Sequence, residues 1–206
     1  MSEPRTVAAA VEEVVPGIRR WSIFDERIDF VSAAYAVTGE EETVLIDPLP
    51  LEPEALAGLE DVRAIVLTCG SHQRCAWRYR RELGMKVHAP ALSREIDEEP
   101  DVRYGDGDEL PGGLRAVFTP GAGTTQHTLL LADPKAAFVP DMLVETPEGR
   151  VAMLASRWMY DPEEARRSVE KLLEHDIDVL CLAHGSAVTE GVKEALRGAL
   201  AGPEYG

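Results

Sequence analysis

The chain has 206 residues, enough for one domain with a full hydrophobic core. Hydrophobic residues make up 45% of it and charged residues 28%, which is typical of a soluble globular protein. The formal net charge of −16 gives an acidic surface that repels phosphate backbones, which argues against nucleic acid as a partner.

The sequence also argues against a membrane-bound or secreted protein. No apolar run approaches the roughly 18–20 residues of a membrane span. The segment MSEPRTVAAAVEEVV lacks the basic and apolar regions of a secretory signal. The three cysteines, Cys69, Cys75 and Cys181, are odd in number and show no CxxC spacing. We therefore expect a cytoplasmic protein with reduced thiols.

The first part of the chain predicts β-structure. Residues 1–13 are expected to form a loose or helical lead-in. Apolar and β-branched residues then predict three strands, at 18–24, 28–37 and 43–47. A charged turn separates the first two strands, so this region is predicted to be a β-meander.

From residue 51 the pattern alternates between helix and strand. Helices are expected at 51–59, 72–83, 91–99, 161–174 and 187–200. Strands are expected at 64–68, 85–90, 114–120, 127–132, 136–141 and 178–183. Two sheets with helices outside would bury the apolar faces of all these elements. The sequence therefore predicts a single domain over residues 1–206.

The stretch VLTCGSHQRCAW (66–77) joins a buried strand to a helix through a small polar loop. Such junctions are where α/β proteins often build their sites. Most of the residue types that active sites use are missing from this loop, which raises the question of whether it still has a function.

Several short motifs follow one another in order along the chain: VLIDP (44–48), VLTCGSHQR (66–74), TPGAGTTQHTLLL (119–131), FVPD (138–141) and the segment 160–185, which ends in AHG. With these motifs the chain resembles the metallo-β-lactamase superfamily over roughly residues 15–200. The family's fold is an αββα four-layer sandwich of the α+β type. Its members hold two metals at one edge of the sandwich, and the resemblance implies the same fold here.

The resemblance also implies where metal ligands should stand. The family's His-x-His-x-Asp-His loop falls on residues that are not its usual ligands: Cys69, Ser71, Gln73 and Arg74. Ala122 stands where a later His follows a Thr-Pro-Gly turn. Asp141 and His184 match the bridging Asp and the final His.

These replacements argue against a two-metal centre. Catalytic zinc usually takes three protein ligands from Cys, His, Asp and Glu. Gln and Ser are weak neutral ligands, Ala is none, and Arg repels a cation. We therefore expect no metal cofactor. The predicted function is that of a non-hydrolytic, catalytically inactive relative, which binds a small molecule or acts as a homo-oligomer.

Arg74 is expected to fill the space left by the metals and to pair with Asp141, because an isolated buried carboxylate is costly. In that position Arg74, with Arg78, would favour an anionic small molecule. Trp77 and residues 157–160 are candidates for its apolar contacts. His72 is expected to cap or pack at the start of a helix. Its side chain is not expected to point into the crevice, which is the space at the edge of the sandwich where the family holds its metals.

The alternative function is a hydrolase acting on an ester or thioester bond. It would use a single zinc, manganese or iron ion held by Cys69, Asp141 and His184, with His127 as a substitute ligand. The candidates for a catalytic role are Asp141, His184 and His72. The remaining crevice residues are Cys69, Ser71, Gln73, Arg74, Ala122 and His127.

Overall fold

The computed structural model describes residues 3–39 and 42–206, and its strands form two main sheets. The first sheet has seven strands in chain order: β1 (Glu12–Val15), β2 (Ile18–Asp25), β3 (Phe30–Thr38), β4 (Thr43–Ile46), β5 (Val62–Val66), β6 (Lys86–Pro90) and β7 (Val102–Tyr104). The second has the order β14 (Val179–Leu182), β11 (Lys135–Val139), β10 (His127–Ala132), β9 (Leu114–Phe118) and β8 (Glu109–Leu110). A small separate hairpin pairs β12 (Leu143–Glu145) with β13 (Val151–Met153).

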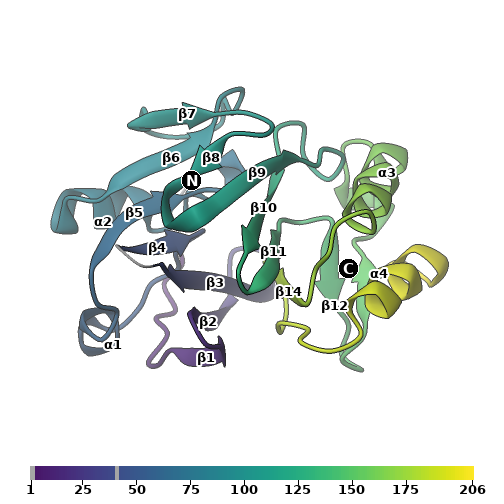
Figure 1. The fold of residues 1–206 in the computed structure, drawn as a ribbon, viewed down its shortest axis with the longest axis horizontal. Helices are drawn as coiled ribbons and strands as arrows, with labels where there is room; N and C mark the ends of the chain where they lie inside the picture. The colour runs from purple at the N-terminus through teal and green to yellow at the C-terminus, as the bar shows by residue number, and fades with distance from the viewer. Residues whose placement is uncertain (1–2, 40–41) are drawn as a thin grey trace.

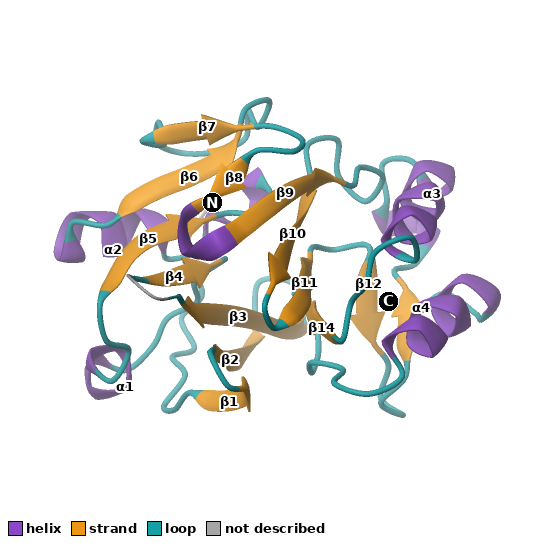
Figure 2. Ribbon diagram, in the orientation of Figure 1, coloured by secondary structure: helices purple, strands orange, loops and turns teal. Residues whose placement is uncertain are grey.

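The α-helices lie on the two outer sides of the sheets (Figures 1 and 2). α1 (Pro53–Ala57) and α2 (Ala76–Leu83) lie beside the first sheet, and α3 (Pro162–Leu172) and α4 (Val192–Ala201) beside the second. Asp161 caps α3 by accepting a hydrogen bond from the Glu164 amide at 3.0 Å, as its sequence predicts.

Three buried clusters fill the three spaces between these layers. Strand β11 shows how: Ala136 and Phe138 face the first sheet, while Ala137 and Val139 face α3 and α4. A strand covered on both faces must be apolar throughout rather than alternating. The predicted αββα sandwich is therefore confirmed.

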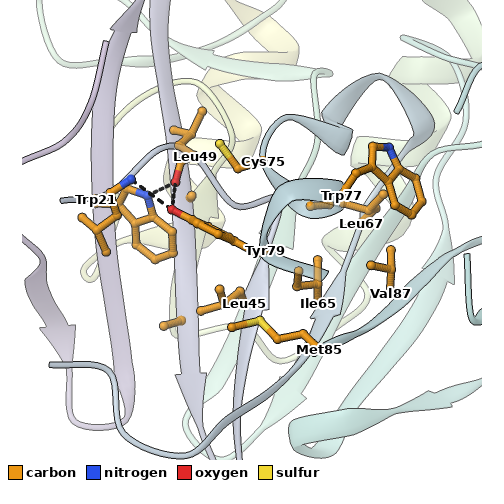
Figure 3. Close-up of a cluster of buried hydrophobic side chains, with 14 of the residues drawn as sticks. Trp21, Leu45, Leu49, Ile65, Leu67, Cys75, Trp77, Tyr79, Met85 and Val87 are labelled. Carbon is orange, nitrogen blue, oxygen red and sulfur yellow. Dashed lines mark hydrogen bonds between the residues drawn. The ribbon is translucent and has the colours of Figure 1, made fainter. Parts of the chain in front are cut away.

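The cluster between the first sheet and its helices contains the large side chains of Trp21, Trp77 and Tyr79 (Figure 3). Trp21 Nε1 donates to the Leu49 carbonyl at 3.1 Å, and the Tyr79 hydroxyl donates to the same oxygen at 3.2 Å. These bonds satisfy the polar tips of buried aromatic rings. They also fix the segment that follows β4, which leads into the candidate site.

Some sequence expectations were wrong. Residues 91–99 form turns rather than a helix, and α2 begins at Ala76 rather than at residue 72. Of the two forms expected for the lead-in, residues 3–11 take the loose one, with a bridge from Ala8 to Leu51, but β1 already begins at Glu12. Residues 1 and 2 lie outside the described part. The short strands β7, β8, β12 and β13 were missed because each has only two or three residues.

Within the described residues, no helix combines the length and the apolar character needed to cross a membrane.

Candidate functional site

The candidate site lies at the edge where both sheets end. Strands β4 and β5 are parallel, as are β11 and β14, so the loops that follow them leave at common edges. These loops carry Asp47, residues 68–74, Asp141 and His184. Backbone bonds join the two sheets here, from the His127 amide to the Thr68 carbonyl at 2.9 Å and from the Ala33 amide to the Ala183 carbonyl at 2.8 Å.

His72 bridges two carboxylates from opposite sheets. Its Nδ1 lies 2.9 Å from Asp47 Oδ2, and its Nε2 lies 2.7 Å from Asp141 Oδ1. The ring is buried, because a short 3₁₀ turn over residues 70–73 directs it back toward the strand ends. The expectation that His72 merely caps or packs was therefore wrong.

Asp47 is held in place from the other side. The Thr68 amide donates to Asp47 Oδ1 at 2.8 Å, and the Thr68 hydroxyl donates to Asp47 Oδ2 at 2.6 Å. Asp47 has φ of +48°, in the left-handed region, which Asp adopts more readily than most residues. The carboxylate thus orients the His72 ring much as outer carboxylates orient histidines in enzymes.

Asp141 collects further polar contacts from the second sheet. His184 Nε2 lies 3.0 Å from Asp141 Oδ1, and Gln126 Nε2 donates to Asp141 Oδ2 at 2.9 Å. The other nitrogen of His184 lies 2.9 Å from the Val31 carbonyl. The side chain of Asp141 is 23% exposed, whereas that of His72 is 6% exposed, so Asp141 is the member of this group that meets solvent.

The charges around His72 and Asp141 favour the charged form of each side chain. Burial by itself would lower the pKa of His72, but the Asp141 carboxylate, with smaller contributions from Cys69 and Asp47, raises it well above its ordinary value. Burial would likewise raise the pKa of Asp141. His72 and then His184 outweigh that effect and hold the pKa of Asp141 well below its ordinary value.

The expected pairing of Arg74 with Asp141 is contradicted. Arg74 is buried, and its Nη1 donates to the backbone carbonyls of Ala33 at 2.8 Å and Asp47 at 3.0 Å. Its backbone has φ of +33° and ψ of −110°, a conformation that costs a non-glycine residue on the order of 1–3 kcal/mol. This turn sends the side chain between β3 and the end of β4, so His72 rather than Arg74 is the partner of Asp141.

Gln73, at the position of the family's aspartate, connects structural elements instead. Its Oε1 accepts from Trp77 Nε1 at 2.6 Å and from the Asp97 amide at 2.8 Å, and its Nε2 donates to the Glu95 carbonyl at 3.4 Å. Segment 91–99 is thereby fastened to the site loop. Glu95 lies so close to Gly70 that a Cβ on Gly70 would be 2.5 Å from Glu95 Oε1.

Cys69 lies next to the bridging histidine. In the part of the chain that the structure describes, Cys69, His72 and Asp141 each offer one ligand atom, and these three atoms lie within 4.8 Å of one another. The Cys69 sulfur is also 3.0 Å from the Ser71 hydroxyl. The expected set of Cys69, Asp141 and His184 is thus corrected, since His72 takes the place of His184 in the compact cluster.

The other predicted site residues lie apart from this cluster. His127 is buried, its Nδ1 is 3.0 Å from the Thr125 carbonyl, and its ring contacts those of Tyr104 and Phe118. The Ala122 carbonyl accepts from the Tyr160 amide at 3.2 Å. Trp77 belongs to α2 and is buried in the core, so the expectation that it lines a pocket mouth was wrong.

Sequence reasoning missed two members of the site. The predicted strands leave Gln126 just before one strand and Asp47 at the end of another, with no role for either side chain. The available signal is that each of these polar residues directly adjoins a strand. That signal alone does not show which side chains turn inward.

The residues present do not fit the two-metal arrangement that the family resemblance implies. Arg74 occupies a ligand position with a buried cation, and Gln73 uses both ends of its amide in other contacts. Ala122 has no donor side chain. Asp141 and His184 keep ligand chemistry, but both face His72 rather than a second set of ligands.

Comparisons with known proteins agree on the family. The family model described as "Metallo-beta-lactamase superfamily" matches residues 13–201. No curated protein matches the chain. Among solved structures, a metallo-beta-lactamase from Pontibacter korlensis has a TM-score of 0.73 and 17% identity, covering 92% of this chain and 96% of its own.

Two other structures give the same picture. DIM-1 metallo-beta-lactamase has a TM-score of 0.74 at 13% identity, covering 95% of this chain and 97% of its own. An archaeal superfamily protein from Sulfolobus tokodaii has a TM-score of 0.66 at 18% identity, covering 88% and 84%. Such identities establish the fold alone, and with the family model they lead to one conclusion: the chain belongs to the metallo-beta-lactamase superfamily.

Proposed function

We propose that this protein is a non-hydrolytic member of the superfamily that binds a small molecule at the exposed side of Asp141. The observation that carries the proposal is the engagement of Arg74 and Gln73, at two ligand positions, in contacts within the protein. A site loop committed to structural bonds is not available to hold the metals that activate water in hydrolytic relatives. A ligand would then be held by hydrogen bonds and apolar contacts instead of by a metal ion.

The surroundings of Asp141 support a ligand with an apolar ring and a hydrogen-bond donor. Phe30 packs against His184 with ring centroids 5.9 Å apart, and against Tyr205 with centroids 6.1 Å apart. The carboxylate of Asp141, which contacts His184, accepts hydrogen bonds and is partly exposed. Aromatic walls with a few placed polar groups are typical of small-molecule sites.

The expectation of an anionic ligand depended on the positive charges of Arg74 and Arg78. Arg74 is buried on backbone carbonyls, and Arg78 Nε pairs with Glu3 Oε2 at 2.9 Å. Both guanidinium groups on which that expectation depended are therefore engaged within the protein.

The proposal is tested by two measurements on the same preparations. Wild-type protein is assayed against ester, thioester and lactam substrates, and we expect no turnover above that of Asp141→Asn. A fragment library rich in aromatic amines and alcohols is then screened by thermal shift. Hits should weaken in Asp141→Asn and Phe30→Ala but not in Leu83→Ala, a control that truncates an exposed apolar side chain on α2. Turnover that depends on Asp141 would refute the proposal.

Self-association is a further form of the proposal. Phe24 and Val31 are direct cross-strand partners on the β2–β3 hairpin, and both are exposed, as is Ile28 in its turn. Exposed apolar residues grouped in this way suit a contact between copies. Light scattering after size exclusion should show an oligomer that Phe24→Asp dissociates. A monomeric wild-type protein would refute self-association.

The three free cysteines accord with a cytoplasmic location.

A single-metal hydrolase is the second candidate function, favoured by the cluster of Cys69, His72 and Asp141. Sulfur, imidazole nitrogen and carboxylate oxygen are donors that zinc accepts, and manganese or iron would use the nitrogen and oxygen. Such an ion would supply Lewis acidity toward an ester or thioester carbonyl. One tightly held metal per chain, lost in Asp141→Ala, would favour this candidate.

A further inference from the structure

We propose that the His72 ring, carrying a proton on each nitrogen, replaces the family's metal ions as the counter-charge of Asp47 and Asp141. The disagreement between this site and the two-metal pattern is then an exchange of one kind of cation for another. The inference concerns what holds the crevice together, and it stands whether or not the crevice binds a ligand.

The hydrogen-bond geometry of His72 carries the argument. Nδ1 faces Asp47 Oδ2 at 2.9 Å and Nε2 faces Asp141 Oδ1 at 2.7 Å. An ionised carboxylate only accepts hydrogen bonds, so each nitrogen must donate one. A ring that donates from both nitrogens is an imidazolium, and its bonds to carboxylates are of the short, charge-assisted kind.

The contact between His72 and Asp141 is direct. Nε2 of His72 and Oδ1 of Asp141 are 2.7 Å apart, the length of a charge-assisted hydrogen bond. A proton held between these two atoms therefore accounts for their separation.

Cationic side chains already lie beside both carboxylates that face His72. Asp47 and Asp141 supply two negative charges, and His72 with the buried Arg74 supplies two positive ones. The other titratable groups facing the ring are Cys69, within 4.8 Å, and His184, whose ring centroid is 5.7 Å from that of His72. Buried charges persist when they are paired and hydrogen-bonded, and this group meets both conditions.

Chemical rescue tests the proposal directly. In His72→Ala the two carboxylates lose their shared cation, and we expect the folded-to-unfolded ratio to fall by about 150- to 5,000-fold. Added imidazole should restore the unfolding midpoint in a saturable manner. His127→Ala is the matched control, because it removes another buried ring that faces a backbone carbonyl rather than carboxylates. Equal rescue of both variants, or rescue of neither, would overturn the proposal.

Two measurements on the unmodified protein keep the proposal testable if His72→Ala fails to fold. Long-range ¹H–¹⁵N spectra at neutral pH should show both ring nitrogens of His72 protonated, and a neutral ring would overturn the proposal. Elemental analysis after exposure to Zn²⁺, Mn²⁺ and Fe²⁺ should find no stoichiometric metal, and chelator should leave the melting temperature unchanged. A tightly held ion would also overturn it. None of these outcomes depends on the hydrolysis assay, so the two proposals fail separately.

Discussion

The two sheets contribute to the crevice in different ways. The second sheet supplies Asp141 and His184, which keep the residue types of the family pattern and contact each other beside His72. The first sheet supplies the loop 68–74, in which the expected ligands are replaced and the side chains make other contacts. Gln73 reaches the segment 91–99, and Arg74 reaches the carbonyls beside β3 and β4.

This difference shows what happens to a site loop whose usual ligands are absent. Gln73 and Arg74 make contacts that stabilise the fold, whereas the second sheet presents the partly exposed Asp141, which a ligand could contact. His72 connects the two regions, because it bonds to one carboxylate from each. Variants of the first region should therefore change stability, and variants of the second should change binding.

The largest effect is expected for Arg74→Met. The change leaves two buried carbonyls without their donor and removes a buried cation beside Asp47, which typically costs about 3–5 kcal/mol. Urea unfolding measures the loss. Arg167→Met, which removes an exposed ion pair on α3, should leave the midpoint unchanged. If both variants were equally stable, Arg74 would not have the structural role described.

Gln73→Ala should have the next largest effect, about 2–3 kcal/mol, because Trp77 loses the acceptor of its buried N–H. Hydrogen exchange should also become faster across residues 91–99, which Gln73 fastens to the site loop. Gln126→Ala removes a glutamine from the second region, where one donor to the partly exposed Asp141 is worth about 1 kcal/mol. Equal exchange rates for segment 91–99 in both variants would contradict the structural role that separates Gln73 in the first region from Gln126 in the second.

The stabilisation from His72 should depend on pH. The pKa of His72 is raised in the folded state, so its contribution is complete below the unfolded value near 6.5 and is lost as pH rises toward the folded value. Asp141 has a lowered pKa, so its contribution is complete above about 4 and is lost in acid. The stability difference between wild type and His72→Gln should therefore be largest between about pH 4 and 6.5.

Above this window the difference should shrink by at most about 1.4 kcal/mol per pH unit. Chemical unfolding at a series of pH values measures it. A difference that grew as pH rose would have the wrong sign for a buried imidazolium.

Cys69→Ala should have the smallest effect, about 1 kcal/mol, since it removes a small buried group and a weak contact with Ser71. Thermal unfolding with and without added Zn²⁺ checks this. A wild-type midpoint that Zn²⁺ raises and a Cys69→Ala midpoint that it does not would instead support the single-metal candidate.

Much of the fold could be predicted because apolar periodicity is local. The β2–β3 meander, the hairpin of β10 and β11, and the capped start of α3 follow from neighbouring residues. Segment 91–99 could not be predicted, because its helical composition is overridden by the contacts that Gln73 and Glu95 make across the site loop.

For the candidate site, the sequence by itself determined that Asp141 and His184 lie at the ends of predicted strands and that the family's His-x-His-x-Asp-His pattern is absent. Only the tertiary structure decided which cation meets Asp141. That choice depends on the backbone at Arg74, whose positive φ turns its side chain away, and on the 3₁₀ turn that brings His72 in. The partners of His72 come from strands of different sheets, so no local pattern in the sequence encodes their meeting.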